Sequence, residues 1–325
     1  MSMHTMVVGG GALGSILAAH LGSSGERVTL VARGKRADHL ERNGVTITGL
    51  EELQIPVTIA RTASDVKDVD LLILATKTYD TASALAGIRL SRPPLAFSIQ
   101  NGVQKNIDLA NVFGADNVLG AAAHFSGEVR SDQVTAFTVH DSLQLGELNG
   151  VASERLSTVV ALLSNAGIKA RQVTDISAVE WSKYALYSAV TAPSVLTRAP
   201  TWQTLSDPDA ALIVAQIVRE IGILANTQGL TLKDEGFLPA ATLCRVGMTE
   251  AVEIMLKFGD FLRKNVPGHK LSALQDLERG RRLEADATLG FAVRLAAEKG
   301  LSVPTIETCY RLCMMLDRHA QLSAP

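Results

Sequence analysis

A glycine-rich segment near the start of the chain restricts most strongly what this sequence can fold into. Residues Gly9–Gly14 read Gly-Gly-Gly-Ala-Leu-Gly and fit the pattern G-x-G-x-x-G. The apolar run Thr5–Val8 precedes them and the helical stretch Leu13–Leu21 follows, so the glycines join an expected strand to an expected helix. This context predicts a loop that binds the phosphates of a dinucleotide at the start of the helix. A plain strand-to-helix turn is the alternative.

Each glycine of the pattern has its own task in such a loop. Gly9 permits a tight turn, Gly11 lets the backbone approach a pyrophosphate, and Gly14 allows close packing of helix and strand. The whole segment is therefore expected to bind the cofactor, through Gly9, Gly10, Gly11, Ala12, Leu13 and Gly14.

Short apolar runs alternate with helical stretches over the first 175 residues. After Thr5–Val8 the runs are Val28–Ala32, Leu71–Ala75 and Leu95–Ile99, and Thr81–Ala86 is helical between the last two. Continuous apolar runs are typical of strands buried on both faces of a parallel sheet. The alternation predicts an α/β domain of the Rossmann type, doubly wound, over residues 1–175.

The end of this domain has a different pattern. Residues 120–148 are strand-rich, and we expect them to form an antiparallel extension of the sheet. A helix over Ser153–Asn165 and a last strand over Ile168–Val173 complete the domain.

Strand signals nearly vanish after Ser177. Helical patterns dominate there, including Ala210–Gln228 and Leu274–Lys299, which we expect to be one helix ending at Gly300. The sequence predicts an all-α C-terminal domain over residues 176–325.

Two capping boxes mark expected helix starts in this second half. Ser177 with Glu180 fits S-x-x-E just before Lys183, and Ser272 with Gln275 fits S-x-x-Q. Both serines are therefore expected to be N-caps.

The end of the second expected strand indicates which dinucleotide binds. An NAD site usually has Asp or Glu there, ~20 residues past the glycines, to bond the ribose 2′-hydroxyl. Arg33 occupies that place, with Lys35 and Arg36 beside it. Arginine can bind a 2′-phosphate through two charge-assisted bonds, which favours NADP(H) over NAD(H). Solvated loop cations are the alternative.

Composition excludes several classes of partner. The 325 residues carry 31 Lys+Arg and 33 Asp+Glu, so no excess positive charge favours nucleic acid or an anionic membrane. No apolar run approaches the ~18 residues of a membrane span, and no secretory signal pattern is present. The three cysteines lack metal-site spacing, and we expect no metal and a cytoplasmic protein.

In the order of its motifs the sequence resembles the ketopantoate reductases (2-dehydropantoate 2-reductases). The motifs are the glycine loop, the segment Val28–Gly34, Lys77, Gln100–Val103, Trp181–Lys183, Ser272–Asp276 and Glu284. The resemblance implies an N-terminal Rossmann domain, an all-α C-terminal domain and an active site between them. It also implies NADPH-dependent reduction of a small 2-oxo acid, ketopantoate or a relative, as in pantothenate biosynthesis.

The resemblance also implies roles for single residues. Lys77 and Asn101 would lie beside the cofactor, Asn101 also beside the substrate. Lys183 would be the catalytic lysine, while Ser272 and Glu284 would hold the substrate and Glu284 would couple to the lysine. An ammonium suits this task because negative charge grows on the carbonyl oxygen as hydride reaches its carbon. For Glu284 a helix-surface position is the alternative reading.

One departure from the family concerns the substrate. Tyr187 and Thr191 follow Lys183 at four-residue intervals, so the three share one helix face. The family commonly has asparagines at the two later positions. We therefore expect Tyr187 and Thr191 to contact the substrate and to disfavour ketopantoate, unless Ser188 or a water replaces the lost amides.

Two other functions stay open at this point. One is a non-catalytic NADP-binding redox sensor, which would need only the N-terminal half of the chain. The other is a β-hydroxyacid or opine-type dehydrogenase. The oligomeric state is also open, with a homodimer as one form.

Overall fold

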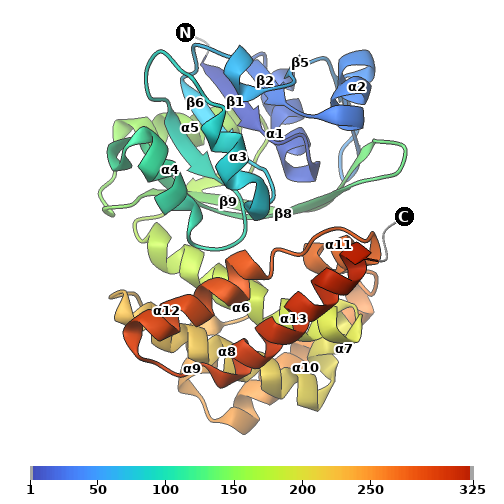
Figure 1. The fold of residues 1–325 in the computed structure, drawn as a ribbon, viewed down its shortest axis with the longest axis vertical. Coiled ribbons are helices and arrows are strands. Elements are labelled where there is room, and N and C mark those ends of the chain that lie inside the picture. The colour runs from blue at the N-terminus through green and yellow to red at the C-terminus, as the bar shows by residue number, and fades with distance from the viewer. Residues whose placement is uncertain (1–2, 323–325) are drawn as a thin grey trace. The chain divides into compact units, whose positions relative to one another are not determined.

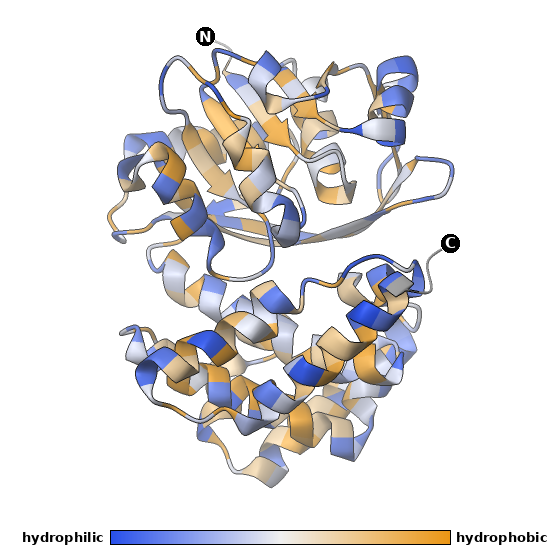
Figure 2. Cartoon of the chain, in the orientation of Figure 1, coloured by the Kyte–Doolittle hydropathy of each residue, from blue (hydrophilic) through white to orange (hydrophobic). Residues whose placement is uncertain are grey.

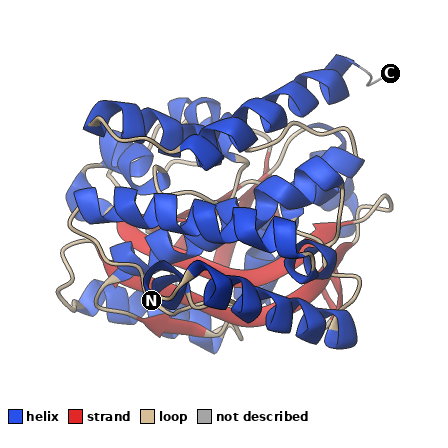
Figure 3. Ribbon diagram, turned by 90° about the horizontal axis from the view of Figure 1, so that it is seen from below, coloured by secondary structure: helices blue, strands red, loops and turns tan. Residues whose placement is uncertain are grey.

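The computed structural model describes residues 3–322 and divides between Ser177 and Ala178 into two compact units. The sequence placed this division between residues 175 and 176. The first unit contains strands and helices, and the described part of the second contains helices only (Figures 1 and 3). The expected fold class, a Rossmann-type α/β domain followed by an all-α domain, is confirmed.

The described residues of the first unit form ten strands and five complete α-helices. The strands are β1 His4–Val8, β2 Arg27–Val31, β3 Val45–Gly49, β4 Leu53–Ile55, β5 Thr58–Ala60, β6 Leu71–Leu74, β7 Leu95–Ser98, β8 Leu119–Val129, β9 Thr135–Glu147 and β10 Ala170–Gln172. The helices are α1 Ala12–Ser23, α2 Gly34–Asn43, α3 Thr81–Ala86, α4 Lys105–Phe113 and α5 Glu154–Asn165, with short 3₁₀ turns η1 Ala63–Asp65, η2 Thr78–Asp80 and η3 Ala115–Asn117.

The first sheet is parallel and has the strand order β5-β2-β1-β6-β7. Counted along the chain this is 3-2-1-4-5, so the order reverses between β1 and β6. In open α/β sheets ligands bind at this reversal, outside the carboxyl ends of the strands. The glycine loop follows β1 directly and therefore lies at this point.

Side chains of this sheet alternate between two apolar layers. Met6 and Val8 of β1 belong to a core shared with α3 and α4, whereas Val7 belongs to a core shared with α1 and α5. Since both faces are covered, most positions of these strands are apolar and buried, as the sequence predicted (Figure 2).

The strand-rich stretch after Gly120 forms a second sheet rather than an extension of the first. β8 and β9 do pair antiparallel, but β9 also pairs with β3 and β10, in the order β10-β9-β3-β4. A single bridge between Ala96 and Val118 connects the two sheets. The sequence pattern identified the hairpin and not its neighbours, because β3 and β4 are short and only half buried.

The second unit is built from α-helices that follow one another with short connections. They are α6 Ile176–Thr197, α7 Thr201–Ser206, α8 Pro208–Thr227, α9 Ala240–Arg245, α10 Met248–Asn265, α11 Ser272–Glu278, α12 Phe291–Lys299 and α13 Pro304–Leu322, with a π-helical turn η4 over Asp286–Gly290.

The expected single helix over Leu274–Lys299 is broken, and this prediction was wrong. α11 ends at Glu278 and Gly280 adopts a left-handed conformation with φ +64°, which reverses the chain. The helix resumes only at η4 and α12, which ends at Gly300 (φ +65°) as expected. Gly280 lies in the charged stretch Glu278–Glu284. Such a stretch is also typical of the solvent-exposed face of a helix, so the sequence pattern gave no sign of the break.

α8 is a core helix of the second unit. By length and composition alone it could cross a membrane, with a mean hydropathy of 1.4. Its polar side chains, however, bond to neighbouring segments: Arg219 Nε donates to the Leu243 carbonyl at 3.0 Å, and Glu220 accepts from the Thr305 N–H at 3.0 Å. Its apolar residues are buried within the unit.

The glycine loop fits closely against the end of β6. A Cβ at Gly9, where φ is +123°, would lie 2.7 Å from the Ala75 carbonyl carbon, and a Cβ at Gly14 would lie 2.0 Å from the Gly9 carbonyl oxygen. The Ala75 N–H donates to Val8 at 2.8 Å and fixes this approach. A Cβ at Gly11 would meet nothing within 4 Å. A Cβ at Gly10 would lie 2.8 Å from the Ala32 Cβ, so three of the four glycines are required by packing and only Gly11 faces open space.

This difference predicts opposite outcomes for two alanine substitutions. Gly14→Ala should lower the free energy of unfolding by roughly 1–3 kcal/mol or more, because the added methyl overlaps backbone. Gly11→Ala should change it by less than about 1 kcal/mol, since its φ of −70° suits alanine and only N-cap preference is lost. Urea unfolding followed by circular dichroism measures both. Equal losses would contradict the packing described here.

Candidate functional site

The start of α1 is free to receive an anion. Gly11 is the N-cap, no side chain caps the first turn, and that turn contains no acidic residue. The unsatisfied N–H groups and the positive end of the helix dipole therefore face the space that Gly11 leaves open. This cradle suits the pyrophosphate of a dinucleotide.

Arg33 and Arg36, three residues apart in sequence, have different environments. Arg33 follows β2, is the N-cap residue of α2 and is exposed. Arg36 is half buried, and its guanidinium donates to the Gly10 carbonyl at 2.8 Å and to Ser15 Oγ at 2.8 Å. The alternative that Arg33, Lys35 and Arg36 are all solvated loop cations is therefore wrong for Arg36. Arg33, by contrast, is exposed to solvent.

Lys77 and Asn101 both follow strands of the first sheet. Lys77 comes after β6 and precedes η2, while Asn101 comes after β7 and precedes Gly102, which has φ +92°. Both are half buried. Because parallel strands end at the same edge, the two residues border the same edge as the glycine loop.

A buried amide joins the two strand ends. Gln100 Nε2 donates to the Thr76 carbonyl at 2.9 Å and to Thr81 Oγ1 at 2.8 Å. Buried Lys105 donates from Nζ to the carbonyls of Gln100, at 3.2 Å, and of Ala121, at 2.5 Å. Gln100 and Lys105 thus fix the loops that carry Lys77 and Asn101. Sequence reasoning missed both roles, and nothing in the pattern marks Lys105 as a buried residue.

In the second unit α6 carries the predicted row. The helix begins at Ile176, so Ser177 is inside its first turn and is not the N-cap. Asp175, whose residue type is also favoured at N-cap positions, immediately precedes the helix. Lys183 is half buried, whereas Tyr187 and Thr191 are buried at 8% and 7% exposure. Ser188, the suggested replacement for the lost amides, is completely buried.

Tyr187 connects this row to Ser272. The Tyr187 hydroxyl and Ser272 Oγ are 3.0 Å apart. Ser272 is the first residue of α11 and Leu271 is its N-cap, so the second capping box was also wrong. Gln275 instead donates to the Lys270 carbonyl at 3.1 Å. The serine hydroxyl is therefore engaged by the tyrosine and not by its own helix.

Thr191 adds an unsatisfied group to the same helix. Its Oγ1 is buried and has no hydrogen-bond partner among residues 3–322. A buried hydroxyl without a partner costs free energy, unless a bound molecule or water completes it.

Glu284 lies at the break between α11 and α12. It is 6% exposed, so the surface-helix reading is wrong. Thr288 Oγ1 donates to the Glu284 carbonyl at 3.0 Å, and Asp317 accepts from the neighbouring Leu283 N–H at 2.7 Å. The hydroxyl of Tyr184 on α6 donates to the Thr288 carbonyl at 2.8 Å. These bonds fix the turn of Glu284 next to the helix that carries Lys183.

The described residues contain no metal-ligand cluster, and two of the three cysteines are buried. Residues 3–322 contain no group of three or more His, Cys, Asp or Glu side chains placed to hold a metal ion. Cys309 and Cys313 are buried, and burial raises the pKa of their thiols to about 11 and about 12. Neither thiol therefore ionises near neutral pH.

Known proteins resemble the chain over nearly its whole length. The chain is 25% identical over 307 residues to the 2-dehydropantoate 2-reductase of Archaeoglobus fulgidus, covering 94% of this chain and 95% of that protein. A PanE/ApbA family ketopantoate reductase from Ralstonia eutropha superposes with a TM-score of 0.83 at 22% identity, covering 98% and 100% of the two chains. A ternary structure of D-mandelate dehydrogenase with NADH and anilino(oxo)acetate gives 0.84 at 19% identity, covering 98% and 99%.

Two family models cover the two units in turn. Residues 5–150 match the model described as ketopantoate reductase PanE/ApbA, and residues 175–317 match the model of its C-terminal domain. Both halves of the fold, with the glycine loop in one and Lys183 in the other, are therefore accounted for by one family. The chain belongs to the ketopantoate reductase (PanE/ApbA) family.

Proposed function

We propose that this protein is an NADPH-dependent reductase of a 2-oxo acid whose substrate is more apolar than ketopantoate. The family consists of oxidoreductases, and relatives such as the Archaeoglobus fulgidus enzyme are named for 2-dehydropantoate, a 2-oxo acid. The observation that carries the proposal is the contact between Tyr187 and Ser272. It brings the start of α11 to the helix face of Lys183, with an aromatic ring where the family commonly has an amide.

The residues at the end of β1 fit a dinucleotide. The cradle at Gly11 is open and is bordered by backbone, because Gly9 and Gly14 lack side chains. Arg33, exposed at the end of β2, would bind a 2′-phosphate. The bound NADPH would supply the hydride.

Lys183 would act on the carbonyl oxygen of the substrate. Negative charge grows on this oxygen as its carbon is reduced, and the ammonium stabilises the charge and donates the proton. Ser272 and Glu284 would hold the substrate, and the bonds around Thr288 keep the turn of Glu284 fixed.

The ring of Tyr187 favours an apolar substituent on the substrate. An aromatic face rewards apolar burial, whereas the hydroxyl of ketopantoate is best bound by an amide. D-mandelate dehydrogenase, by its name, acts on an aromatic 2-hydroxy acid and has the same fold. The fold is therefore compatible with a 2-oxo acid that carries an aromatic ring.

Replacement of Arg33 tests the cofactor. Arg33→Ala should raise the Kd for NADPH by about 10–100-fold, the loss expected for a charge-assisted bond to phosphate, and leave the Kd for NADH nearly unchanged. Calorimetric titration measures both, with Arg42→Ala on α2 as the matched control. Equal affinity of the unmodified protein for the two cofactors would contradict the assignment.

Replacement of Lys183 tests the chemical step. Lys183→Ala should lower kcat by about 10²-fold or more, because a positioned proton donor is lost, while the Kd for NADPH changes little. Lys257→Ala, which removes an exposed lysine of α10, serves as the control. A Lys183→Ala protein that folds and retains near-normal kcat would rule out the role.

Introducing asparagines at positions 187 and 191, where the family commonly has them, tests the proposed substrate preference. In the variant Tyr187→Asn/Thr191→Asn, kcat/KM for ketopantoate should rise relative to that for phenylglyoxylate, because amides replace a ring and a methyl group. Tyr187→Phe keeps the ring but loses the bond to Ser272, and should retain the preference for phenylglyoxylate. Efficient reduction of ketopantoate by the unmodified protein, with no gain in the double variant, would show the pocket reading to be wrong.

A further inference from the structure

Arg36 lies in the first turn of α2 and bonds to three other segments of the first unit. Its guanidinium donates to the Gly10 carbonyl at 2.8 Å, to Ser15 Oγ at 2.8 Å and to Thr135 Oγ1 at 3.0 Å. It also donates to the carbonyl of Gln133, in the turn between β8 and β9. Arg36 therefore links the glycine loop, α1 and this hairpin.

The charge of Arg36 is kept although the group is largely removed from water. Burial lowers the pKa of the guanidinium to about 10, so the group stays protonated at neutral pH. Guanidinium has five N–H donors, and four bonds to oxygen are present. Arg36 therefore has few N–H donors left for a ligand. In this respect it differs from Arg33, which is exposed.

The bond to the Gly10 carbonyl determines the direction of the next N–H. A trans peptide is planar, so its C=O and the following N–H point in opposite directions. With the Gly10 oxygen directed to Arg36, the Gly11 N–H is directed to the opposite side of the loop. Ser15 Oγ also contacts the Gly10 oxygen, at 3.3 Å, and supports the same orientation.

This orientation matters because the loop is flexible by composition. Three consecutive glycines, Gly9 to Gly11, can adopt many backbone conformations, and ordering them costs free energy when a ligand binds. A loop held beforehand in one conformation avoids part of that cost. Arg36 also stabilises the turn between β8 and β9. Gln133 in this turn has an unfavourable positive φ of +69°, and its carbonyl accepts a hydrogen bond from Arg36.

We propose that Arg36 is a positioning residue of the dinucleotide site. It holds the Gly10–Gly11 peptide so that the Gly11 N–H faces the pyrophosphate, and it acts on the part of the cofactor that NADPH and NADH share. The inference rests on the proposed function, because it requires that the loop bind a dinucleotide. It assigns the two arginines separate tasks: Arg33 selects the cofactor and Arg36 shapes the loop.

Titrations of the full-length protein with NADPH and with NADH test this assignment. Arg36→Ala should raise both Kd values by the same factor, about tenfold or more, and leave their ratio unchanged. Arg36→Lys, which keeps the charge but not the planar fork, should give a smaller and equally shared loss. An effect confined to NADPH would show that Arg36 binds the 2′-phosphate and would overturn the proposal, as would unchanged affinity for both cofactors.

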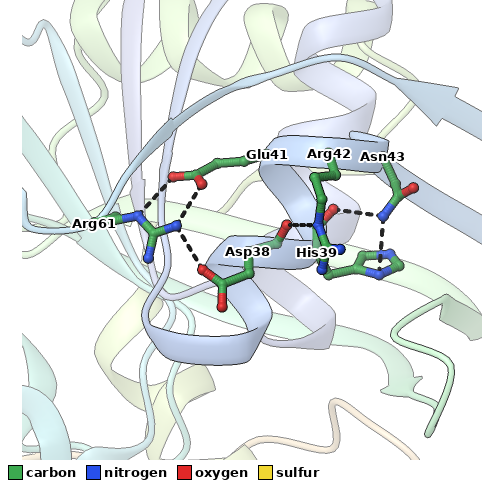
Figure 4. A network of polar contacts seen from close by, with 6 residues as sticks. All are labelled: Asp38, His39, Glu41, Arg42, Asn43 and Arg61. Carbon is green, nitrogen blue, oxygen red and sulfur yellow. Dashed lines mark hydrogen bonds and ion pairs between the residues drawn. The ribbon is translucent and has the colours of Figure 1, made fainter.

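Arg61 provides the matched control. It follows β5 and bonds to Asp38 at 2.7 Å and to Glu41 at 2.6 Å, both on the exposed side of α2 (Figure 4). Arg61→Ala therefore removes an arginine that holds the same helix without contact to the glycine loop. Its Kd values should match those of the unmodified protein, and losses equal to those of Arg36→Ala would reduce Arg36 to a merely structural role.

A second variant covers the case in which Arg36→Ala does not fold. Ser15→Ala/Thr135→Val removes two acceptors of the guanidinium but keeps the arginine, and it should weaken both cofactors equally and by less. No loss in this variant would contradict the proposal. If the unmodified protein binds neither NADPH nor NADH, the proposed function itself fails, which is a distinct result.

Discussion

The first unit depends on the absence of two side chains at the glycine loop. Without a Cβ at Gly9 and Gly14, the loop lies against the carbonyl group of Ala75, and α1 starts directly over the junction of β1 and β6. The strand order of the sheet reverses at this junction, so its edge is the natural place for a ligand. Polar bonds then complete the site around the loop: Arg36 holds the Gly10 carbonyl and Gln100 joins the strand ends near Lys77 and Asn101.

In the second unit a break between α11 and α12 determines where Glu284 lies. Gly280 ends α11 and a π-helical turn precedes α12, so Glu284 lies in a buried turn instead of on a solvated face. π-helical turns are frequent at functional sites. The side chains of Asp317 and Tyr184 fix this turn by hydrogen bonds to its main chain, at the Leu283 N–H and the Thr288 carbonyl. The contact between Tyr187 and Ser272 joins α11 to α6 in the same region.

The parts of the fold that could be predicted are those whose sequence pattern arises from a single physical requirement, such as burial on both faces of a sheet. Runs such as Leu71–Leu74 are apolar throughout because both faces of the sheet are covered, and Gly9–Gly14 carries a spacing required by packing. Short, half-buried strands such as β3 and β4 have no such pattern and were missed. The helix break at Gly280 was missed because a charged stretch looks alike in a helix and in a turn.

The contacts of the candidate-site residues could not be predicted from local spacing. Capping boxes at Ser177 and Ser272 were inferred from local spacing, but Ser272 bonds instead to Tyr187, 85 residues away in sequence. The role of Arg36 was equally hidden, since its acceptors Gly10 and Thr135 are brought to it by tertiary structure. Spacing reports bonds within one helix, whereas these bonds join segments far apart in the chain.

Steady-state oxidation of NADPH by the unmodified protein, with phenylglyoxylate and ketopantoate as paired substrates, distinguishes a 2-oxo acid reductase with an apolar substrate site from a cofactor sensor. We expect turnover with both substrates and a higher kcat/KM for phenylglyoxylate, accompanied by formation of the 2-hydroxy acid. Tight binding of NADPH with no turnover of any 2-oxo acid would contradict a reductase function, and would leave a cofactor sensor in its place.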